Sequence, residues 1–136
     1  MADTRFVIYI SAGLGNYLAL GMESFRISDL QLTASSEVDA DHSASCSRFN
    51  HNIRGGAWIP KTPDQSEYLQ IDLGWIMILT GIATQGHPEK HYRTLTYQVK
   101  HRISLSVAFK NYPQVCDRLF NILIAFRFCL YLFTLM

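Results

Sequence analysis

Charged residues are scarce in this chain of 136 residues, and neither sign dominates. Only 17% of the residues are charged, and 12 Lys and Arg against 11 Asp and Glu leave a formal net charge of +1. No basic run or stripe is present that could follow the phosphates of a nucleic acid. We therefore do not expect a nucleic acid as a partner.

Cysteine is also rare, and the motifs of catalysis are missing. The three cysteines are an odd number, which cannot make a closed disulfide framework, and no CxxC pair suggests a zinc or redox site. There is no nucleophile elbow, phosphate loop, HExxH motif or carboxylate pair with catalytic spacing. We expect a protein that is not an enzyme and has no catalytic residues, no metal-binding residues and no cofactor.

Long apolar runs occur only near the two ends of the chain. Residues 1–19 contain an apolar run that fits either a signal peptide or an apolar N-terminal strand. Residues 119–136 carry Arg127 as their only charge, and their length is close to the ~20 residues of a membrane span. An Arg near the middle costs roughly 2.5–3.5 kcal/mol on insertion. A tail anchor, a buried helix and translated sequence foreign to the domain are the alternatives, and we favour the last.

The middle of the chain has the pattern of an all-β domain. Short apolar runs are separated by clusters of Gly, Pro, Asn, Asp and Ser, and segments with a helical period are absent. Residues 68–73 alternate between apolar and polar, Gly74 allows a turn, and residues 76–83 are apolar on both faces. We expect two neighbouring strands of a closed β shell here and a further strand at 94–99. The predicted core residues are Trp58, Tyr68, Leu69, Ile71, Leu73, Ile78 and Ile82.

Several motifs occur in an order that resembles a known family. They are "LGMES" at 20–24, "TASS" at 33–36, Arg48 and Asn50 of an "ARLN"-like element, "GAW" at 56–58, "YLQIDLG" at 68–74 and "TGIATQG" at 80–86. Together they resemble the discoidin domain, also called the coagulation factor V/VIII type C domain, over residues 20–99. The resemblance implies an antiparallel β-sandwich of the distorted jelly-roll type, with a binding surface formed by loops at one end.

The chain also departs from that family. Phe25 stands where the family usually has Gly, and Ile59 follows "GAW" where Cys is common. Residues 100–136 match none of the expected later strands. We therefore expect an incomplete sandwich followed by a divergent apolar tail, for which a helix is one of the open alternatives.

The resemblance places the ligand-binding loops at 37–45 and 87–91. The candidate binding residues are Glu37, Asp39, Asp41, His42, His87, Glu89, Lys90 and His91. Because burying such charges at a membrane is costly, we favour a glycan or an extracellular protein over a phospholipid. The alternating acids could offer oxygens to Ca²⁺, and the spacing of His87 and His91 suits a metal, but a solvated loop and a surface turn are the simpler interpretations.

These observations lead to one favoured function and two alternatives. We expect a secreted or cell-surface adhesion and recognition module of the discoidin type. The first alternative is an inert product, truncated or mispredicted at its end. The second is a membrane-anchored form held by residues 119–136.

Overall fold

The computed structural model describes residues 5–11, 17–62, 64, 66–87, 89, 97–111 and 124–126. Its regular elements are short strands and single 3₁₀ turns, and all strand pairs are antiparallel, so the described part of the chain is all-β. The elements in chain order are β1 (Arg5–Ser11), β2 (Tyr17–Ala19), η1 (Asp29–Gln31), β3 (Leu32–Ala34), η2 (Ala40–His42), η3 (Ala44–Ser47), β4 (Leu69–Ile71), β5 (Met77–Gln85), β6 (Lys100–His101), β7 (Lys110–Asn111) and β8 (Ile124–Phe126).

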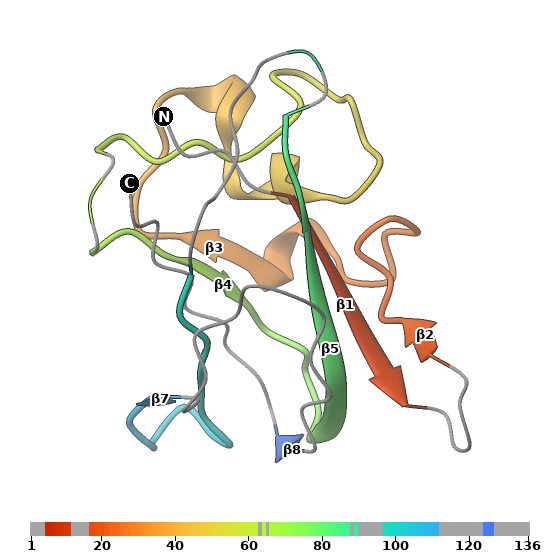
Figure 1. Cartoon of the computed structure of the whole chain (residues 1–136). Helices are drawn as coiled ribbons and strands as arrows, with labels where there is room; N and C mark the ends of the chain where they lie inside the picture. Colours follow the sequence, from red (N-terminus) through yellow and green to blue (C-terminus); the bar gives the residue numbers. More distant parts are fainter. Residues whose placement is uncertain are drawn as a thin grey trace.

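The largest sheet has the strand order β2-β1-β5-β8, and two smaller sheets pair β3 with β4 and β6 with β7. The two longest strands, β1 and β5, run side by side through its centre (Figure 1). Their register extends from Arg5 opposite Gln85 to Ile10 opposite Leu79, with an irregularity between Tyr9 and Ile10. The apolar run near the start of the chain therefore contains a central strand.

The two strands expected to be neighbours, 68–73 and 76–83, lie in different sheets, so that expectation was wrong. β4 pairs with β3, whereas β5 pairs with β1 and β8. Gly74 lies between them with φ +77°, and its N–H donates to Asp72 Oδ1 (2.8 Å). Gln31 Nε2 also donates to the carbonyl oxygen of Asp72 (2.6 Å). These bonds hold the connection as a crossing between sheets instead of a two-residue hairpin.

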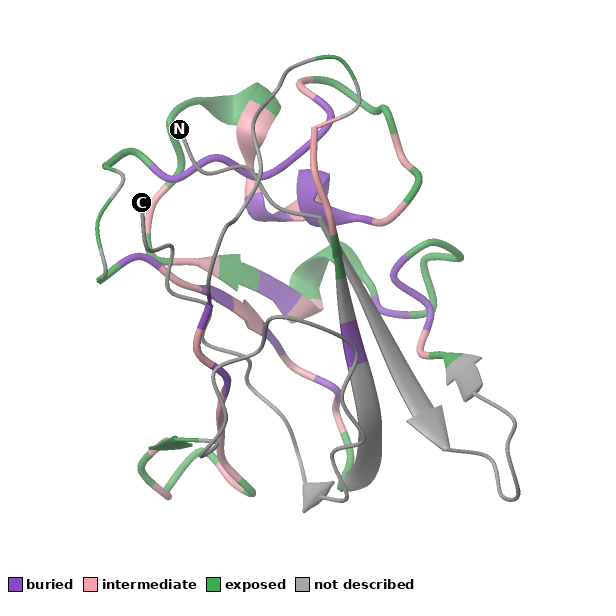
Figure 2. Ribbon diagram, in the orientation of Figure 1, coloured by how far each residue is buried: buried purple, intermediate pink, exposed green. Residues whose placement is uncertain are grey.

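The core lies between β3, β4, η3 and the end of the loop that contains Trp58, where buried positions gather in Figure 2. Trp58, Leu69, Ile71, Leu73 and Ile82 are all buried. Tyr68 is only half-buried, because it alternates with Leu69 and so faces away from the core. The side chain of Ile78 lies outside the described residues. Further buried side chains are Met22, Ile27, Leu32, Cys46, Ile59, Tyr97 and Val99.

The apolar C-terminal segment is extended where the structure describes it. Ile124–Phe126 forms β8 and pairs with the start of β5, with Met77 opposite Phe126. The helical reading of the tail was therefore wrong for these three residues, because the open edge of β5 offers backbone partners that an extended chain can use. The rest of 112–136 lies outside the described residues. Among the described residues there is no helix long and apolar enough to cross a membrane.

The strand expected at 94–99 is not formed in its described part. Residues 97–99 are not part of a strand, although burial alternates there: Tyr97 and Val99 are buried and Gln98 is half-buried. Pairing begins one residue later, where β6 meets β7. Residues 94–96 lie outside the described residues.

Candidate binding surface

A buried carboxylate anchors the loop that follows β3. Glu67, only 5% exposed, accepts hydrogen bonds from Ser36 Oγ (2.6 Å), Thr62 Oγ1 (2.7 Å) and the Ser35 hydroxyl. Ser35 also exchanges bonds with the backbone of Tyr68: its N–H donates to the carbonyl oxygen (2.9 Å), and its hydroxyl accepts from the Tyr68 N–H (2.8 Å). The two serines of the "TASS" motif therefore tie the end of β3 to the start of β4.

The environment of Glu67 favours its charged form. Burial alone would raise the pKa of this carboxyl group, but the hydroxyl donors of Ser35, Ser36 and Thr62 outweigh burial and hold its pKa below the usual 4.5. A carboxylate that stays ionised inside the protein can accept several hydrogen bonds at once. Glu67 therefore stabilises the base of the loop as an anion.

Two acidic residues of the 37–45 loop, Glu37 and Asp39, bond to the backbone of that loop. Asp39 Oδ1 caps η2 by accepting from the N–H groups of Asp41 and His42, both at 3.0 Å, and it also pairs with His42 Nδ1 (2.7 Å). The hydrogen bond from His42 is the main reason that the pKa of Asp39 is lowered. Glu37 Oε1 accepts from the Ala44 N–H (2.8 Å). Two of the three carboxylates thus shape the loop.

Gly55 joins this loop to two others. Its N–H donates to the carbonyl oxygen of Asp41 (2.9 Å), and its own carbonyl oxygen accepts from His87 Nε2 (2.7 Å). His87 Nδ1 in turn accepts the N–H of Glu89 (3.0 Å). A β carbon at Gly55 would overlap the His42 ring and lie 2.7 Å from the carbonyl oxygen of Asp41, so only glycine allows this approach. We call the loops 37–45, 53–56 and 86–89, held together at Gly55, the loop junction.

The loop junction lies at one end of the molecule, opposite β7 and β8 (Figure 1). Of the predicted binding residues, four are exposed and two are half-buried, and Lys90 and His91 lie outside the described residues. The exposed four are Glu37, Asp39, Asp41 and Glu89, and the half-buried two are His42 and His87. The described residues contain no group of three or more His, Cys, Asp or Glu that could hold a metal ion.

The sequence reasoning missed the contribution of residues 53–56. This loop lies between the two predicted binding loops and exposes Ile53 (51%) and Arg54, whose Nη1 donates to the carbonyl oxygen of Ala40 (3.4 Å). The available signal in the sequence is the Gly55-Gly56 pair. A glycine pair can also mark a place where two backbones approach closely.

A second missed cluster surrounds Phe25. Arg48 is 1% exposed; its Nη1 donates to the carbonyl oxygen of Met22 (2.9 Å), and its Nε donates to Asp29 Oδ1 (3.1 Å), to which Nη2 also bonds. The guanidinium carbon of Arg48 lies 4.4 Å from the centre of the Phe25 ring. The sequence signal that could have pointed to this cluster is Phe25 itself, which stands where the discoidin family usually has Gly.

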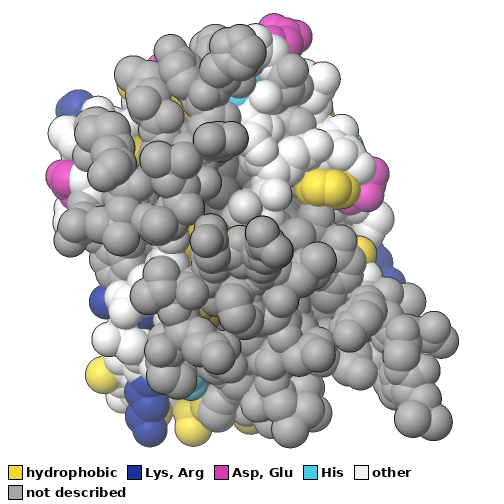
Figure 3. Space-filling view, in the orientation of Figure 1, with side chains coloured by type: hydrophobic (Ala, Val, Ile, Leu, Met, Phe, Trp, Pro, Cys, Tyr) yellow, Lys and Arg dark blue, Asp and Glu magenta, His cyan; other side chains and the backbone are white. Residues whose placement is uncertain are grey.

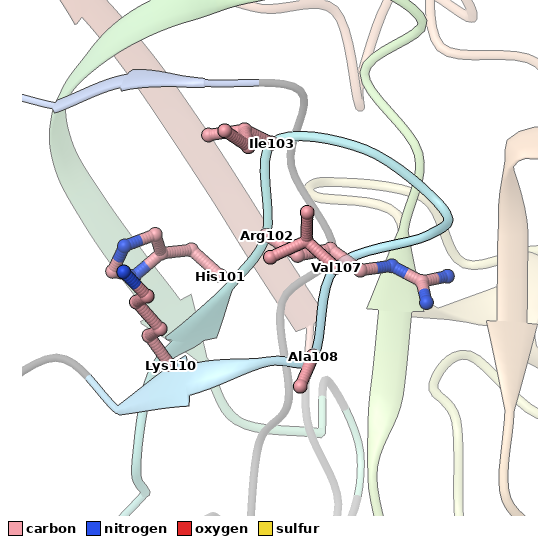
Figure 4. A pocket seen from close by; sticks show the side chains of 6 residues that line it. All are labelled: His101, Arg102, Ile103, Val107, Ala108 and Lys110. Carbon is pink, nitrogen blue, oxygen red and sulfur yellow. The ribbon is translucent and has the colours of Figure 1, made fainter.

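A small cavity lies at the other end of the described part of the chain. It lies in the β6–β7 hairpin and has a volume of about 60 Å³, well below the roughly 300–1,000 Å³ of a ligand pocket. Figure 4 shows His101 and Lys110 close together, with the Arg102 guanidinium on the other side of the hairpin loop. Burial and then the charge of Lys110 lower the pKa of His101. We assign no ligand to this cavity.

Comparison with known proteins finds relatives that match part of this chain. The chain is 38% identical to human neuropilin-1 over 88 residues, which is 65% of this chain and 9% of neuropilin-1. It is 46% identical to mouse coagulation factor VIII over 72 residues, 51% of this chain and 3% of factor VIII, and 38% identical to rat neuropilin-2 over 86 residues, 60% of this chain and 9% of neuropilin-2. The chain thus spans less than a tenth of the length of these relatives.

The model of the F5/8 type C domain matches residues 31–118. This range starts later and ends later than the resemblance seen in the motifs, and it includes the β6–β7 hairpin. Since the match covers more than half of the chain, the protein belongs to the F5/8 type C domain family.

Proposed function

We propose that this chain is an extracellular recognition module that binds a glycan or a protein through the loop junction. The observation that carries the proposal is the pair of backbone hydrogen bonds of Gly55, one to Asp41 and one from His87. These bonds hold three loops in one arrangement. A surface that is already ordered loses less conformational entropy on binding than loops that must be ordered by the ligand. F5/8 type C domains are binding modules, and the chain is not an enzyme.

The chemistry of the loop junction suits a glycan or protein better than a phospholipid surface. Asp41 and Glu89 are exposed carboxylates, and burying them against anionic headgroups would be unfavourable. Val38 and Ile53, exposed by 40% and 51%, add apolar area among these charges. A ligand with hydroxyl, amide or cationic groups beside a small apolar surface would match this mixture.

The proposal includes two finer points. We propose that the described sheets are parts of a distorted jelly-roll sandwich, which would place the three loops at one rim as Figure 1 arranges them. We also propose that the protein acts outside the cell or on its surface, as the family membership supports. Ca²⁺ stays a candidate ligand of the acidic loop that a calcium titration of the full chain would test.

Binding assays with the full chain test the proposed function. The chain is screened against a glycan array and a panel of extracellular proteins, and hits are measured again with the double variant Asp41→Ala/Glu89→Ala. No side-chain hydrogen bond of either carboxylate contributes to the loop geometry described above, so we expect folding to persist and affinity to fall about tenfold or more.

The control is Lys110→Ala in β7, at the opposite end of the molecule, which should leave affinity unchanged. If the chain binds no glycan on the array and no protein in the panel, the proposal is contradicted. Equal weakening by Lys110→Ala would also contradict it, because the loop junction would then not be the binding surface.

A further inference from the structure

Phe25 has a backbone conformation that phenylalanine rarely adopts. Its φ is +59°, in the left-handed region where glycine is favoured. The ring is nevertheless 47% exposed, so burial in the core does not explain why it is there. Strained backbone conformations cluster at functional sites, so the contacts of this ring bear on function.

One face and one edge of the Phe25 ring are held by fixed partners. The guanidinium of Arg48 lies 4.4 Å from the ring centre, and Arg48 is itself fixed by its bonds to Met22 and Asp29. The His51 ring packs edge-on, with centroids 4.7 Å apart and planes at 77°, and its Nε2 donates to the carbonyl oxygen of Glu23 (2.7 Å). The ring is therefore supported from behind, and its exposed half faces outward.

A network of polar side chains adjoins His51, which packs against this ring. Asn50 Nδ2 donates to Glu23 Oε1 (3.2 Å), and Asn50 and Gln85 are joined by two further bonds, N–H to Gln85 Oε1 (3.1 Å) and Gln85 Nε2 to Asn50 Oδ1 (3.3 Å). Glu23 and Asn50 are exposed. Gln85 ends β5 and directly precedes the 86–89 loop, so this group lies next to the loop junction. We call Phe25, Glu23, Asn50 and Gln85 the Phe25 platform.

We propose that the Phe25 platform binds a pyranose ring of a glycan, an inference that rests on the proposed function and names its ligand class. The π face of an aromatic ring carries partial negative charge, which attracts the weakly positive C–H groups on the apolar face of a sugar. The carboxylate of Glu23 and the amides of Asn50 and Gln85 accept from and donate to the sugar hydroxyls at the rim. A support that is already rigid keeps the ordering cost of binding low.

A purely aliphatic ligand would fit this group less well. It would leave the carboxylate of Glu23 beside an apolar surface without a hydrogen-bond donor, which is unfavourable. A sugar satisfies the ring and the polar rim together, because its apolar face and its hydroxyl edge lie within one small ring.

The test uses the full chain and an array of glycans, followed by titration of the hits and of their methyl pyranosides by saturation-transfer NMR. Phe25→Gly removes the ring at a position whose φ glycine prefers, so the variant should unfold at the same temperature or higher. Phe25→Trp keeps an aromatic face, and Phe25→Leu keeps apolar area without one. Leu30→Gly is the matched control, because it removes an apolar side chain that is 94% exposed and is not part of the Phe25 platform.

We expect Phe25→Gly and Phe25→Leu to weaken binding about tenfold, and Phe25→Trp and Leu30→Gly to stay within about twofold of the unmodified chain. Sugar protons on one ring face should show the strongest saturation transfer. If a glycan binds and Phe25→Gly or Phe25→Leu binds it equally well, the Phe25 platform is wrong and the proposed function stands. If only proteins bind, the platform is again wrong and the loop junction stands, whereas no binding to either panel overturns both.

Discussion

The loop junction and the β6–β7 hairpin hold their backbones in different ways. At the junction, the backbone of Gly55 bonds to two loops that are distant in the chain, and at the loop base Glu67 accepts hydrogen bonds from the hydroxyls of Ser36 and Thr62. The hairpin has a ladder of only two residue pairs, Lys100 with Asn111 and His101 with Lys110. Hydrophobic and basic side chains lie together near this corner in Figure 3. Order in one region depends on a few irreplaceable residues, and in the other on local pairing.

The largest expected effect tests the anchor of the junction. Glu67→Ala removes a buried carboxylate and leaves the hydroxyls of Ser36 and Thr62 without their acceptor, and we expect unfolding free energy to fall by about 3 kcal/mol. Urea denaturation followed by circular dichroism measures it. Glu67→Gln keeps the volume and one acceptor oxygen, and it should cost clearly less. A loss below about 1 kcal/mol for Glu67→Ala would show that the junction does not depend on this carboxylate.

Acid should weaken the same anchor. The pKa of Glu67 is lower in the folded chain than its usual value of 4.5, so its stabilisation is complete above that value and is lost as pH falls through the folded pKa. We expect the difference in urea midpoint between the unmodified chain and Glu67→Gln to be constant from pH 7 to about 5.5 and to shrink below about 4.5. A difference that grows on acidification would contradict this sign.

Two glycine substitutions separate close contact from backbone conformation. Gly55→Ala places a β carbon against His42 and 2.7 Å from the carbonyl oxygen of Asp41, and we expect a loss of about 2 kcal/mol. Gly74→Ala meets only Gln31 Nε2, at 3.9 Å, but its φ of +77° should cost about 1 kcal/mol. The measurement is the thermal midpoint of each variant. If Gly74→Ala cost more than Gly55→Ala, close approach would not be the main constraint at the junction.

The smallest effect is expected in the hairpin. Leu105 is 70% exposed, and Leu105→Ser should change unfolding free energy by less than about 0.5 kcal/mol. The same urea titration measures it beside Glu67→Ala. A loss comparable with that of Glu67→Ala would remove the contrast between the two regions, because the hairpin would then be as dependent on single side chains as the junction.

Local patterns in the sequence were enough to predict several parts of the molecule. The alternation at 68–73 predicted that Leu69, Ile71 and Leu73 share a face, and all three are buried. The glycine at 74 predicted a change of chain direction, and Gly74 has a φ of +77°, a conformation that glycine favours. These features depend on a period of two residues and on the conformational freedom of glycine, which need no knowledge of distant segments.

The pairing of strands could not be predicted in the same way. An apolar alternating segment shows that it needs a partner but does not say which one, because every backbone offers the same donors and acceptors. The sequence therefore suggested that the segments around Gly74 are neighbours, whereas β4 pairs with β3, and β5 with β1 and β8. The apolar run at 119–136 was equally ambiguous in the sequence, and the structure assigns a partner to residues 124–126 only, as β8 on the edge of β5.

By itself, the sequence determined the all-β character, the family and the region where the loops lie, because composition, periodicity and ordered motifs are properties of nearby residues. Only the tertiary structure decided that Gly55 joins three loops and that Arg48 supports Phe25 from behind. Gly55 and His87 are separated by 32 positions in the chain, and Phe25 and Arg48 by 23. Such contacts form only when packing brings distant segments together, since no local pattern records which side chain will meet which backbone.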